Sequence, residues 1–125
     1  EFISKIIKRI DPFPIYGSDE TRTYCYISDA VRAMQMLMDS QSTSKQPIET
    51  VHIGDSREIS AQALAETMFS IANWRPQSIE QKQSLAGSVK RRRADISKLQ
   101  RLVSWHPEVS LEEGLARTFK WYANL

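Results

Sequence analysis

The stretch IYGSDETRTYCYISDAV, Ile15–Val31, decides the fold of this chain. It starts in a short apolar run that stops at Gly17 and continues through a polar turn into a second run of β-branched and aromatic residues, so it predicts two short strands. Asp29 then stands just before a long apolar segment, a position typical of a helix start. The stretch contains one cation, Arg22, between the two predicted strands and close to the helix.

The rest of the chain alternates between helical and strand-like patterns. Apolar residues at helical spacing predict helices over 3–10, 30–39, 61–73 and 97–105, and one more that starts after residue 110. Runs of β-branched and aromatic residues predict strands over 13–16, 23–27, 49–53 and 89–96. The polar stretches 39–47 and 75–87 are expected to be irregular. Alternating strands and helices indicate an α/β fold, with too few strands for a complete doubly wound sheet.

Several helix starts carry residues that can cap the free amides of a first turn. Ser28 or Asp29 is expected to cap the helix over 30–39, and Ser60 the next one. Ser110 and Glu113 have the spacing of a capping box. The helix over 30–39 is apolar on most of its sides, which predicts burial between layers and not a surface position.

Length and composition limit the possible functions. The chain has 125 residues and a formal net charge of +2, enough for one modest core but too weakly charged to indicate a nucleic-acid or membrane partner. No apolar run approaches the length of a membrane span. The single cysteine, Cys25, excludes an internal disulfide and fits a reducing compartment, so we expect a cytoplasmic protein.

Arg22 is the first candidate for a functional residue. Its guanidinium is permanently charged and its fork of donors suits two oxygens of a phosphate, which would make it an anion-binding residue. The alternative is an ordinary arginine at a surface or strand edge, and spacing alone leaves both open. The glycines are scattered singly, so there is no glycine-rich phosphate loop, and Tyr-x-x-x-Lys is absent from the chain.

The run Lys90–Arg93 contains four consecutive cations. It could bind nucleic acid, but a strand whose alternate residues face solvent explains it as well, and the small net charge favours the strand. His52 and His106 have no metal-ligand spacing, and Cys25 between aromatics is expected to be an apolar packing residue rather than a nucleophile.

Three segments, read in order, resemble a known family: PIYGSDETRTYCYISDAVRAM, VHIGDSREISAQALAETM and VKRRRADISKLQRLVSWHPEVSLEEGLARTFKWY. They are similar to patterns in the C-terminal half of NAD-dependent nucleotide-sugar epimerases and dehydratases, in the extended short-chain dehydrogenase/reductase family. The matching patterns are P-x-x-x-Y-G with Q-x-R-D and V-x-D, then Y-N-[IL]-G, then R-P-G-D with R-x-A-D, L-G-W-x-P and L-E-E-G.

The resemblance implies that residues 1–125 are a single C-terminal substrate-binding region. The fold would be a partial Rossmann-like edge plus a small α/β substrate-binding domain, with the N-terminal dinucleotide-binding half absent. Arg22 would hold the pyrophosphate of a nucleotide-sugar, and Tyr16 would lie near its base. Asp29 matches an Asp that is more structural than chemical. The helix over 30–39 and the strand around Val51 would belong to the edge of the Rossmann layer.

The sequence departs from the family patterns in the phosphate-binding region. The Arg of R-P-G-D is Leu85, so a second phosphate-binding arginine is missing, and Arg91 or Arg92 is a candidate to compensate. Glu20 stands where the family has Gln, and Thr23 where it has Asp. His52 replaces the Asn of Y-N-[IL]-G.

The glycine motif and the Tyr-x-x-x-Lys acid/base pair of the family lie in the missing half. We therefore expect NAD in the parent protein only, and neither cofactor binding nor catalysis by this chain alone. The alternatives are a non-enzymatic binding or regulatory module with a degenerate nucleotide-sugar pocket and, third, a nucleic-acid binder. The apolar helix over 30–39 would be left exposed without the missing half, so we expect self-association.

Overall fold

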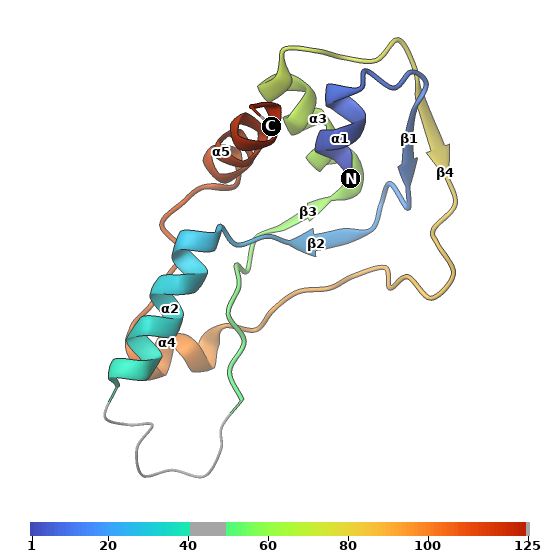
Figure 1. Ribbon diagram of the computed structural model, residues 1–125. Helices are drawn as coiled ribbons and strands as arrows, with labels where there is room; N and C mark the ends of the chain where they lie inside the picture. The colour runs from blue at the N-terminus through green and yellow to red at the C-terminus, as the bar shows by residue number, and fades with distance from the viewer. Residues whose placement is uncertain (41–49, 125) are drawn as a thin grey trace. The chain divides into compact units, whose positions relative to one another are not determined.

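The computed structural model describes residues 1–40 and 50–124 (Figure 1). In chain order the elements are α1 (Phe2–Ile7), β1 (Phe13–Tyr16), β2 (Thr21–Thr23), α2 (Ile27–Asp39), β3 (Glu58–Ser60), α3 (Ala61–Ala72), β4 (Ile79–Lys82), α4 (Ser97–Val103) and α5 (Leu111–Ala123). They form two compact units, each described by itself. Unit 1 consists of Glu1–Arg22, Ile59–Arg92 and Glu112–Leu125, and unit 2 of Thr23–Glu58 and Arg93–Leu111.

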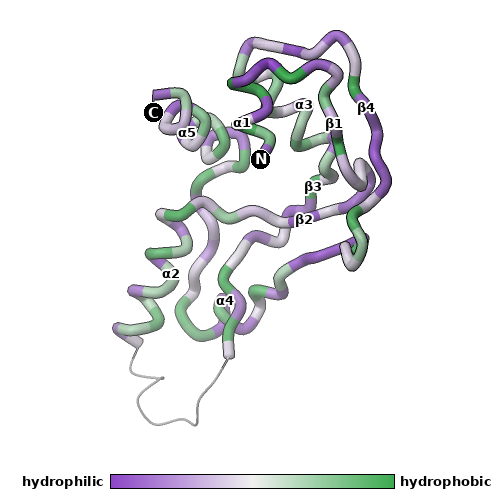
Figure 2. The backbone as a smooth tube through the Cα atoms, turned by 45° about the vertical axis from the view of Figure 1, so that its right-hand side comes forward, coloured by the Kyte–Doolittle hydropathy of each residue, from purple (hydrophilic) through white to green (hydrophobic). Residues whose placement is uncertain are grey.

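The sheet of unit 1 is a parallel pair, β1 and β4, in the register Phe13↔Ile79 to Tyr16↔Lys82. The carboxylate of Asp11 accepts hydrogen bonds from the amides of Gln77 and Ser78 at 2.8 and 3.3 Å, which fixes the segment that leads into β4. After its first residue β4 is exposed, and the purple tube around it shows that it is hydrophilic (Figure 2). Backbone pairing with β1, and not an apolar face of its own, therefore defines β4.

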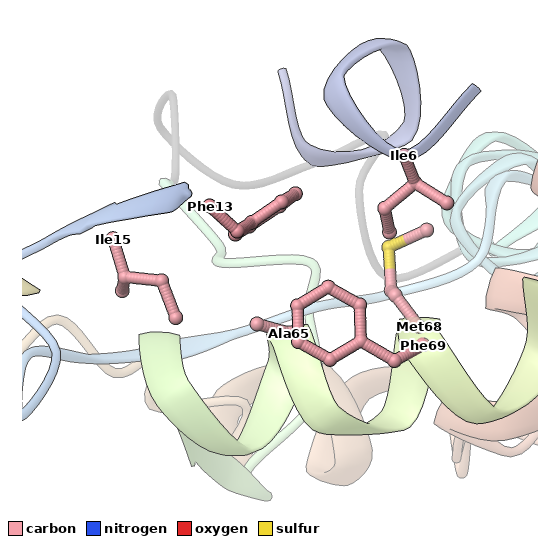
Figure 3. Close-up of a cluster of buried hydrophobic side chains, with 6 residues drawn as sticks. All are labelled: Ile6, Phe13, Ile15, Ala65, Met68 and Phe69. Atoms are coloured by element: carbon pink, nitrogen blue, oxygen red, sulfur yellow. The ribbon is translucent and has the colours of Figure 1, made fainter. Parts of the chain in front are cut away.

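The core of unit 1 lies between β1 and the helices. Side chains from α1, β1 and α3 meet in one cluster: Ile6, Phe13, Ile15, Ala65, Met68 and Phe69 (Figure 3). The Phe13 and Phe69 rings pack edge to face with centroids 4.9 Å apart, a geometry that aromatic pairs favour. Leu115 and Phe119 of α5 pack against the same cluster.

Helix α3 begins and ends as the sequence predicts. The Ser60 hydroxyl accepts a hydrogen bond from the Ala63 amide at 3.1 Å, so the expected cap is confirmed. Asn73 ends the helix in the left-handed conformation with φ of 47°. Asparagine tolerates this conformation better than most residues, which accounts for its place there.

Unit 2 packs α2 against α4 and the segment after it. Its buried cluster consists of Ala33, Ile96, Leu99 and Trp105, with Met36 and Leu37 partly buried against it. The opposite side of α2 is apolar and exposed, with side chains at i, i+4, i+7 and i+11: Ile27, Val31, Met34 and Met38. We call these four residues the α2 stripe. The prediction that this helix is buried on most sides is therefore wrong for the described chain.

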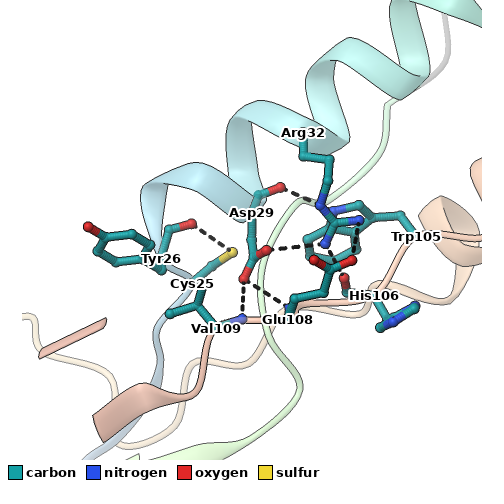
Figure 4. Close-up of polar contacts among 8 residues, drawn as sticks. All are labelled: Cys25, Tyr26, Asp29, Arg32, Trp105, His106, Glu108 and Val109. Carbon is teal, nitrogen blue, oxygen red and sulfur yellow. Dashed lines mark hydrogen bonds and ion pairs between the residues drawn. The ribbon is translucent and has the colours of Figure 1, made fainter. Parts of the chain in front are cut away.

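A buried carboxylate organises the polar part of unit 2 (Figure 4). Asp29 is 2% exposed, and its Oδ2 accepts the amides of Glu108 and Val109 at 3.0 and 2.9 Å. Its Oδ1 accepts a hydrogen bond from Arg32 at 3.1 Å. The indole of Trp105 donates to the Asp29 carbonyl at 3.1 Å. Asp29 thus joins the start of α2 to the segment after α4, which agrees with the structural role that the family resemblance implies for it.

The start of α2 differs from the prediction. The helix begins at Ile27, with Tyr26 at the N-cap position and no side-chain capping bond, so neither Ser28 nor Asp29 caps it. The Asp29 carboxylate does not cap the helix because it accepts hydrogen bonds from the Glu108 and Val109 amides, which lie far away in sequence.

The predicted strands agree only in part with the structure. The strand over 13–16 is confirmed, but the second strand is Thr21–Thr23 instead of 23–27, and 89–96 contributes one bridge, Thr21↔Arg91. Of 49–53, the described residues 50–53 form no strand, and most of the connector over 39–47 lies outside the described residues. The short strands β3, which pairs with β2, and β4 were not predicted. Among the described helices, none has the length and hydropathy to cross a membrane.

Replacing Asp29 tests how much this carboxylate stabilises unit 2. We expect Asp29→Asn to lower the free energy of unfolding by about 2 kcal/mol, because an amide cannot accept all of these hydrogen bonds. Urea unfolding followed by circular dichroism measures the change. Asp39→Asn, at the exposed end of the same helix, is the control and should change stability by less than ~0.5 kcal/mol. Equal stability of the two variants would contradict the role of Asp29.

The stability difference between wild type and Asp29→Asn should also depend on pH. Burial raises the pKa of Asp29, but the Val109 and Glu108 amides and the Arg32 guanidinium outweigh it, so the pKa lies below its ordinary value. A depressed folded-state pKa stabilises the fold above the unfolded pKa of ~3.9. We therefore expect the stability difference between wild type and Asp29→Asn to be complete at neutral pH and to shrink as the pH falls below ~4.

Candidate anion-binding site

The loop that follows β1 is held by the first turn of α3. Gly17 turns the chain with φ of +54°, and the Glu20 amide donates to the Gly17 carbonyl at 2.8 Å. The Ala61 amide donates to the Glu20 carbonyl at 3.0 Å, and the Gln62 amide to the Ser18 carbonyl at 3.1 Å. These amides belong to a helix start, where they have no partner within the helix. The loop backbone is therefore fixed on both sides of Asp19.

Arg22 follows this loop and lies in a polar cluster of unit 1. Its Nη1 donates to the Thr21 carbonyl at 2.8 Å, and its Nη2 donates to Glu20 Oε2 at 2.9 Å and to the Ser88 hydroxyl at 3.3 Å. The Ser88 hydroxyl donates to the same Glu20 oxygen at 2.6 Å. The arginine side chain is 26% exposed and that of Glu20 12%. Guanidinium, carboxylate and hydroxyl thus form a half-buried triad of Arg22, Glu20 and Ser88.

The charge of Glu20 is stabilised in this cluster. Hydrogen bonds from Ser84 and Ser88, with the positive charge of Arg22, hold the pKa of Glu20 below its usual range. The carboxylate is therefore ionised at neutral pH. Ser84 and Ser88 were not predicted as site residues; the only signal for them is that Ser88 takes the place of the Asp in R-P-G-D.

The basic run lies beside Arg22 through its backbone. The Thr21 amide donates to the Lys90 carbonyl at 2.9 Å, and the Arg92 amide donates to the Thr21 carbonyl at 3.1 Å. The Arg92 side chain is exposed, and Lys90 pairs with Asp19 at 3.1 Å. The structure thus places two residues named from the sequence, Arg22 and Arg92, on adjacent segments. Leu85, where the family pattern has arginine, is 65% exposed.

Tyr16 is the last residue of β1 and is 41% exposed. The ammonium group of Lys5 lies 5.5 Å from the centre of its ring, within cation–π range. Gly17 follows directly, so Tyr16 leads into the loop that carries Glu20.

The other residues considered in the sequence do not form a second site. Cys25 is half-buried, and burial raises the pKa of its thiol, so it is protonated at neutral pH and not a reactive thiolate. Both histidines are exposed. Within the described ranges, no group of three or more His, Cys, Asp or Glu side chains could hold a metal ion.

Comparison with known proteins shows the class to which this chain belongs. Residues 1–118 match the family model described as GDP-mannose 4,6 dehydratase. The chain belongs to this family, the NAD-dependent nucleotide-sugar epimerases and dehydratases of the extended short-chain dehydrogenase/reductase type. The resemblance predicted from its three sequence segments is confirmed.

Individual relatives support the same family. The chain is 29% identical over 124 residues to UDP-glucuronic acid decarboxylase 1 of Arabidopsis thaliana, covering 98% of the chain and 27% of that relative. It superposes on UDP-glucose 4-epimerase of Thermotoga maritima, solved with UDP-glucose, with a TM-score of 0.85 and 26% identity, covering 98% of the chain and 38% of that structure. The chain also superposes on UDP-glucuronic acid 4-epimerase of Bacillus cereus, solved with UDP-glucuronic acid and NAD, with a TM-score of 0.83 and 27% identity. This match covers 98% of the chain and 38% of that structure.

These matches confirm the α/β fold, and they also show its extent. The chain spans less than two fifths of the length of these three relatives. What the whole relatives bind and catalyse is therefore not carried over to this chain by similarity alone.

Two glycines allow a matched test of the loop geometry. Gly17 and Gly87 both have positive φ, but a Cβ on Gly17 would lie 2.6 Å from Glu20 Cδ, whereas one on Gly87 would meet nothing within 4 Å. Backbone strain alone costs about 1–2 kcal/mol at either position. We expect Gly17→Ala to lower the urea unfolding midpoint more than Gly87→Ala does, because only the former displaces Glu20. Equal midpoints would contradict the close packing of Glu20 on Gly17.

Proposed function

We propose that residues 1–125 form the nucleotide-sugar-binding region of an NAD-dependent epimerase, dehydratase or decarboxylase. The observation that carries this proposal is Arg22, held half-buried at the end of a loop whose backbone is fixed by α3. Family membership supports it, as does coverage of only 27% to 38% of the three relatives described above. In this proposal the parent protein adds an N-terminal Rossmann half, and the chain is its substrate-binding part.

The proposed roles follow from charge and exposure. Arg22 binds the diphosphate, because its guanidinium is permanently charged and partly open to solvent. The exposed ring of Tyr16 offers a flat face next to the nucleobase. Arg92, on the segment paired with Thr21, supplies a second cation in the region where Leu85 replaces an arginine.

The chemistry itself is assigned to the part of the parent protein outside this chain. When bound there, NAD supplies reversible oxidation of the sugar ring, and a tyrosine of that half acts as the base. The four glycines of this chain are scattered and form no phosphate loop, so we assign none of its residues to the cofactor. Its own task is to bind and orient the nucleotide-sugar.

The α2 stripe fits a chain that is part of a larger protein. Ile27, Val31, Met34 and Met38 are 65%, 42%, 52% and 82% exposed. A contiguous apolar stripe of this kind favours association with another surface. We propose that the rest of the parent protein covers it, and that the 125-residue chain alone buries it by self-association.

A non-enzymatic binding module is the second candidate. The observation in its favour is that Leu85 replaces the second arginine and that Glu20 already engages Arg22. Turnover of a nucleotide-sugar by the intact parent protein distinguishes the two, because a module without chemistry would bind the ligand and leave it unchanged.

Replacing Arg22 tests the substrate assignment. We expect Arg22→Ala to weaken binding of UDP-glucose or GDP-mannose about ten- to hundredfold, since one charge-assisted contact to phosphate contributes roughly 1.5–3 kcal/mol. Arg22→Lys should fall between, because it keeps the charge but loses the fork. Arg75→Ala, which removes an exposed arginine paired with Glu66, is the control and should bind like wild type. Isothermal titration calorimetry gives the affinities. Unchanged binding by Arg22→Ala would refute the role of Arg22.

Charging the α2 stripe tests the proposed association. Sedimentation velocity over a range of concentrations should show self-association of the wild-type chain. We expect Val31→Lys with Met34→Lys to reduce it strongly, because both ammonium groups would have to be buried in the contact. Gln35→Lys, an exposed position of the same helix outside the stripe, is the control and should associate like wild type. A wild-type chain that stays monomeric at all concentrations would contradict the proposal.

A further inference from the structure

Both Nη nitrogens of the Arg22 guanidinium already donate hydrogen bonds within the protein. A guanidinium has two N–H donors on each Nη nitrogen. Both directions from Nη2 are taken, one by the Glu20 carboxylate at 2.9 Å and one by the Ser88 hydroxyl at 3.3 Å. Nη1 donates to the Thr21 carbonyl at 2.8 Å. A phosphate that binds through Nη2 must therefore replace one of these internal partners.

The carboxylate on Arg22 is held by more than the ion pair. Ser84 and Ser88 both donate hydrogen bonds to Glu20, the latter at 2.6 Å. The side chain lies over Gly17, where any Cβ would collide with it. The Glu20 side chain is 12% exposed.

We propose that Glu20 is an internal competitor for the anion, so that its carboxylate must leave Arg22 before a phosphate group binds through Nη2. The inference rests on the proposed function of the Arg22 site. The Glu20 carbonyl and the loop backbone are fixed by the Ala61 and Gln62 amides, so the movement is a rotation of the Glu20 side chain alone.

Departure of the carboxylate also frees further donors. The hydroxyls of Ser84 and Ser88 then no longer donate to the Glu20 carboxylate. Both hydroxyls can donate to phosphate oxygens next to Arg22 Nη2. Ser84 and Ser88 flank Leu85 in sequence and would provide neutral donors in the region where the family has its second arginine. Glu20 therefore sets the affinity of the site: it repels the anion while it remains on Arg22 and exposes a three-donor site when it moves.

The test uses Glu20→Gln, which removes the charge and keeps the shape of the side chain. Calorimetry at pH 7.5 with UDP-glucose, and separately with inorganic pyrophosphate, compares it with wild type. We expect Glu20→Gln to bind UDP-glucose and pyrophosphate about three- to tenfold more tightly than wild type. The reason is that removing an exposed or half-exposed repulsive charge changes an affinity by about this factor. The control for net charge is Glu80→Gln. It removes a carboxylate that pairs with Lys82 on β4. It should bind like wild type.

A double variant separates this inference from the proposed function. Glu20→Gln with Arg22→Ala should lose the gain, since the gain passes through the guanidinium. If Glu20→Gln and wild type bind equally and Arg22→Ala binds weakly, the competitor role is overturned and the proposed function stands. If Glu20→Gln binds more weakly than wild type, Glu20 is a ligand of the substrate, and the competitor role is again overturned. If none of the proteins binds either probe more tightly than Arg22→Ala does, the proposed function itself fails.

Discussion

The hydrogen bonds from the first turn of α3 to the loop after β1 are the constraint on which the candidate site depends. The Ala61 and Gln62 amides have no partner within their helix, and the carbonyls of Glu20 and Ser18 supply one for each. Ser60 caps the same turn through its side chain. The loop is thereby anchored to a helix whose other face is buried in the core of unit 1. Because Arg22 lies only two residues beyond Glu20, its backbone position is defined by the same bonds.

The two units each contain an arginine paired with a carboxylate, and the surroundings give the pairs different roles. Asp29 is 2% exposed and accepts hydrogen bonds from two backbone amides besides the one from Arg32, so we expect its displacement to lower stability. Among the described residues, the donors to the Glu20 carboxylate are side chains: Arg22, Ser84 and Ser88. Side-chain hydroxyls and a guanidinium can turn to a new acceptor, whereas backbone amides cannot. The first pair is therefore structural, and the second is the one for which we propose an exchange of partners.

The apolar pattern of α2 was interpreted as burial on most sides, and the structure shows why the pattern misled. Apolar residues fall on both sides of this helix, but α4 and Trp105 cover only the side of Ala33 and Leu37. The α2 stripe on the other side stays 42% to 82% exposed among the described residues. A sequence pattern records which faces are apolar and does not record which partner covers each of them.

Local patterns in the sequence were enough to predict β1, the extent and cap of α3, the structural role of Asp29 and the family of the chain. Strand β1 and the cap of α3 depend on residues close together in sequence, whose spacing and backbone preferences act before any long-range contact forms. The family and the structural role of Asp29 came instead from the resemblance of the sequence segments to family patterns. The pairing of β4 with β1 and the hydrogen bond between Glu20 and Ser88 could not be predicted in this way. Ser88 lies 68 residues after Glu20, and β4 has almost no strand pattern of its own, since only its first residue is apolar and partly buried. These features arise only when the folded chain brings distant segments together, and they decide whether the positive charge of Arg22 is open to a ligand or already paired.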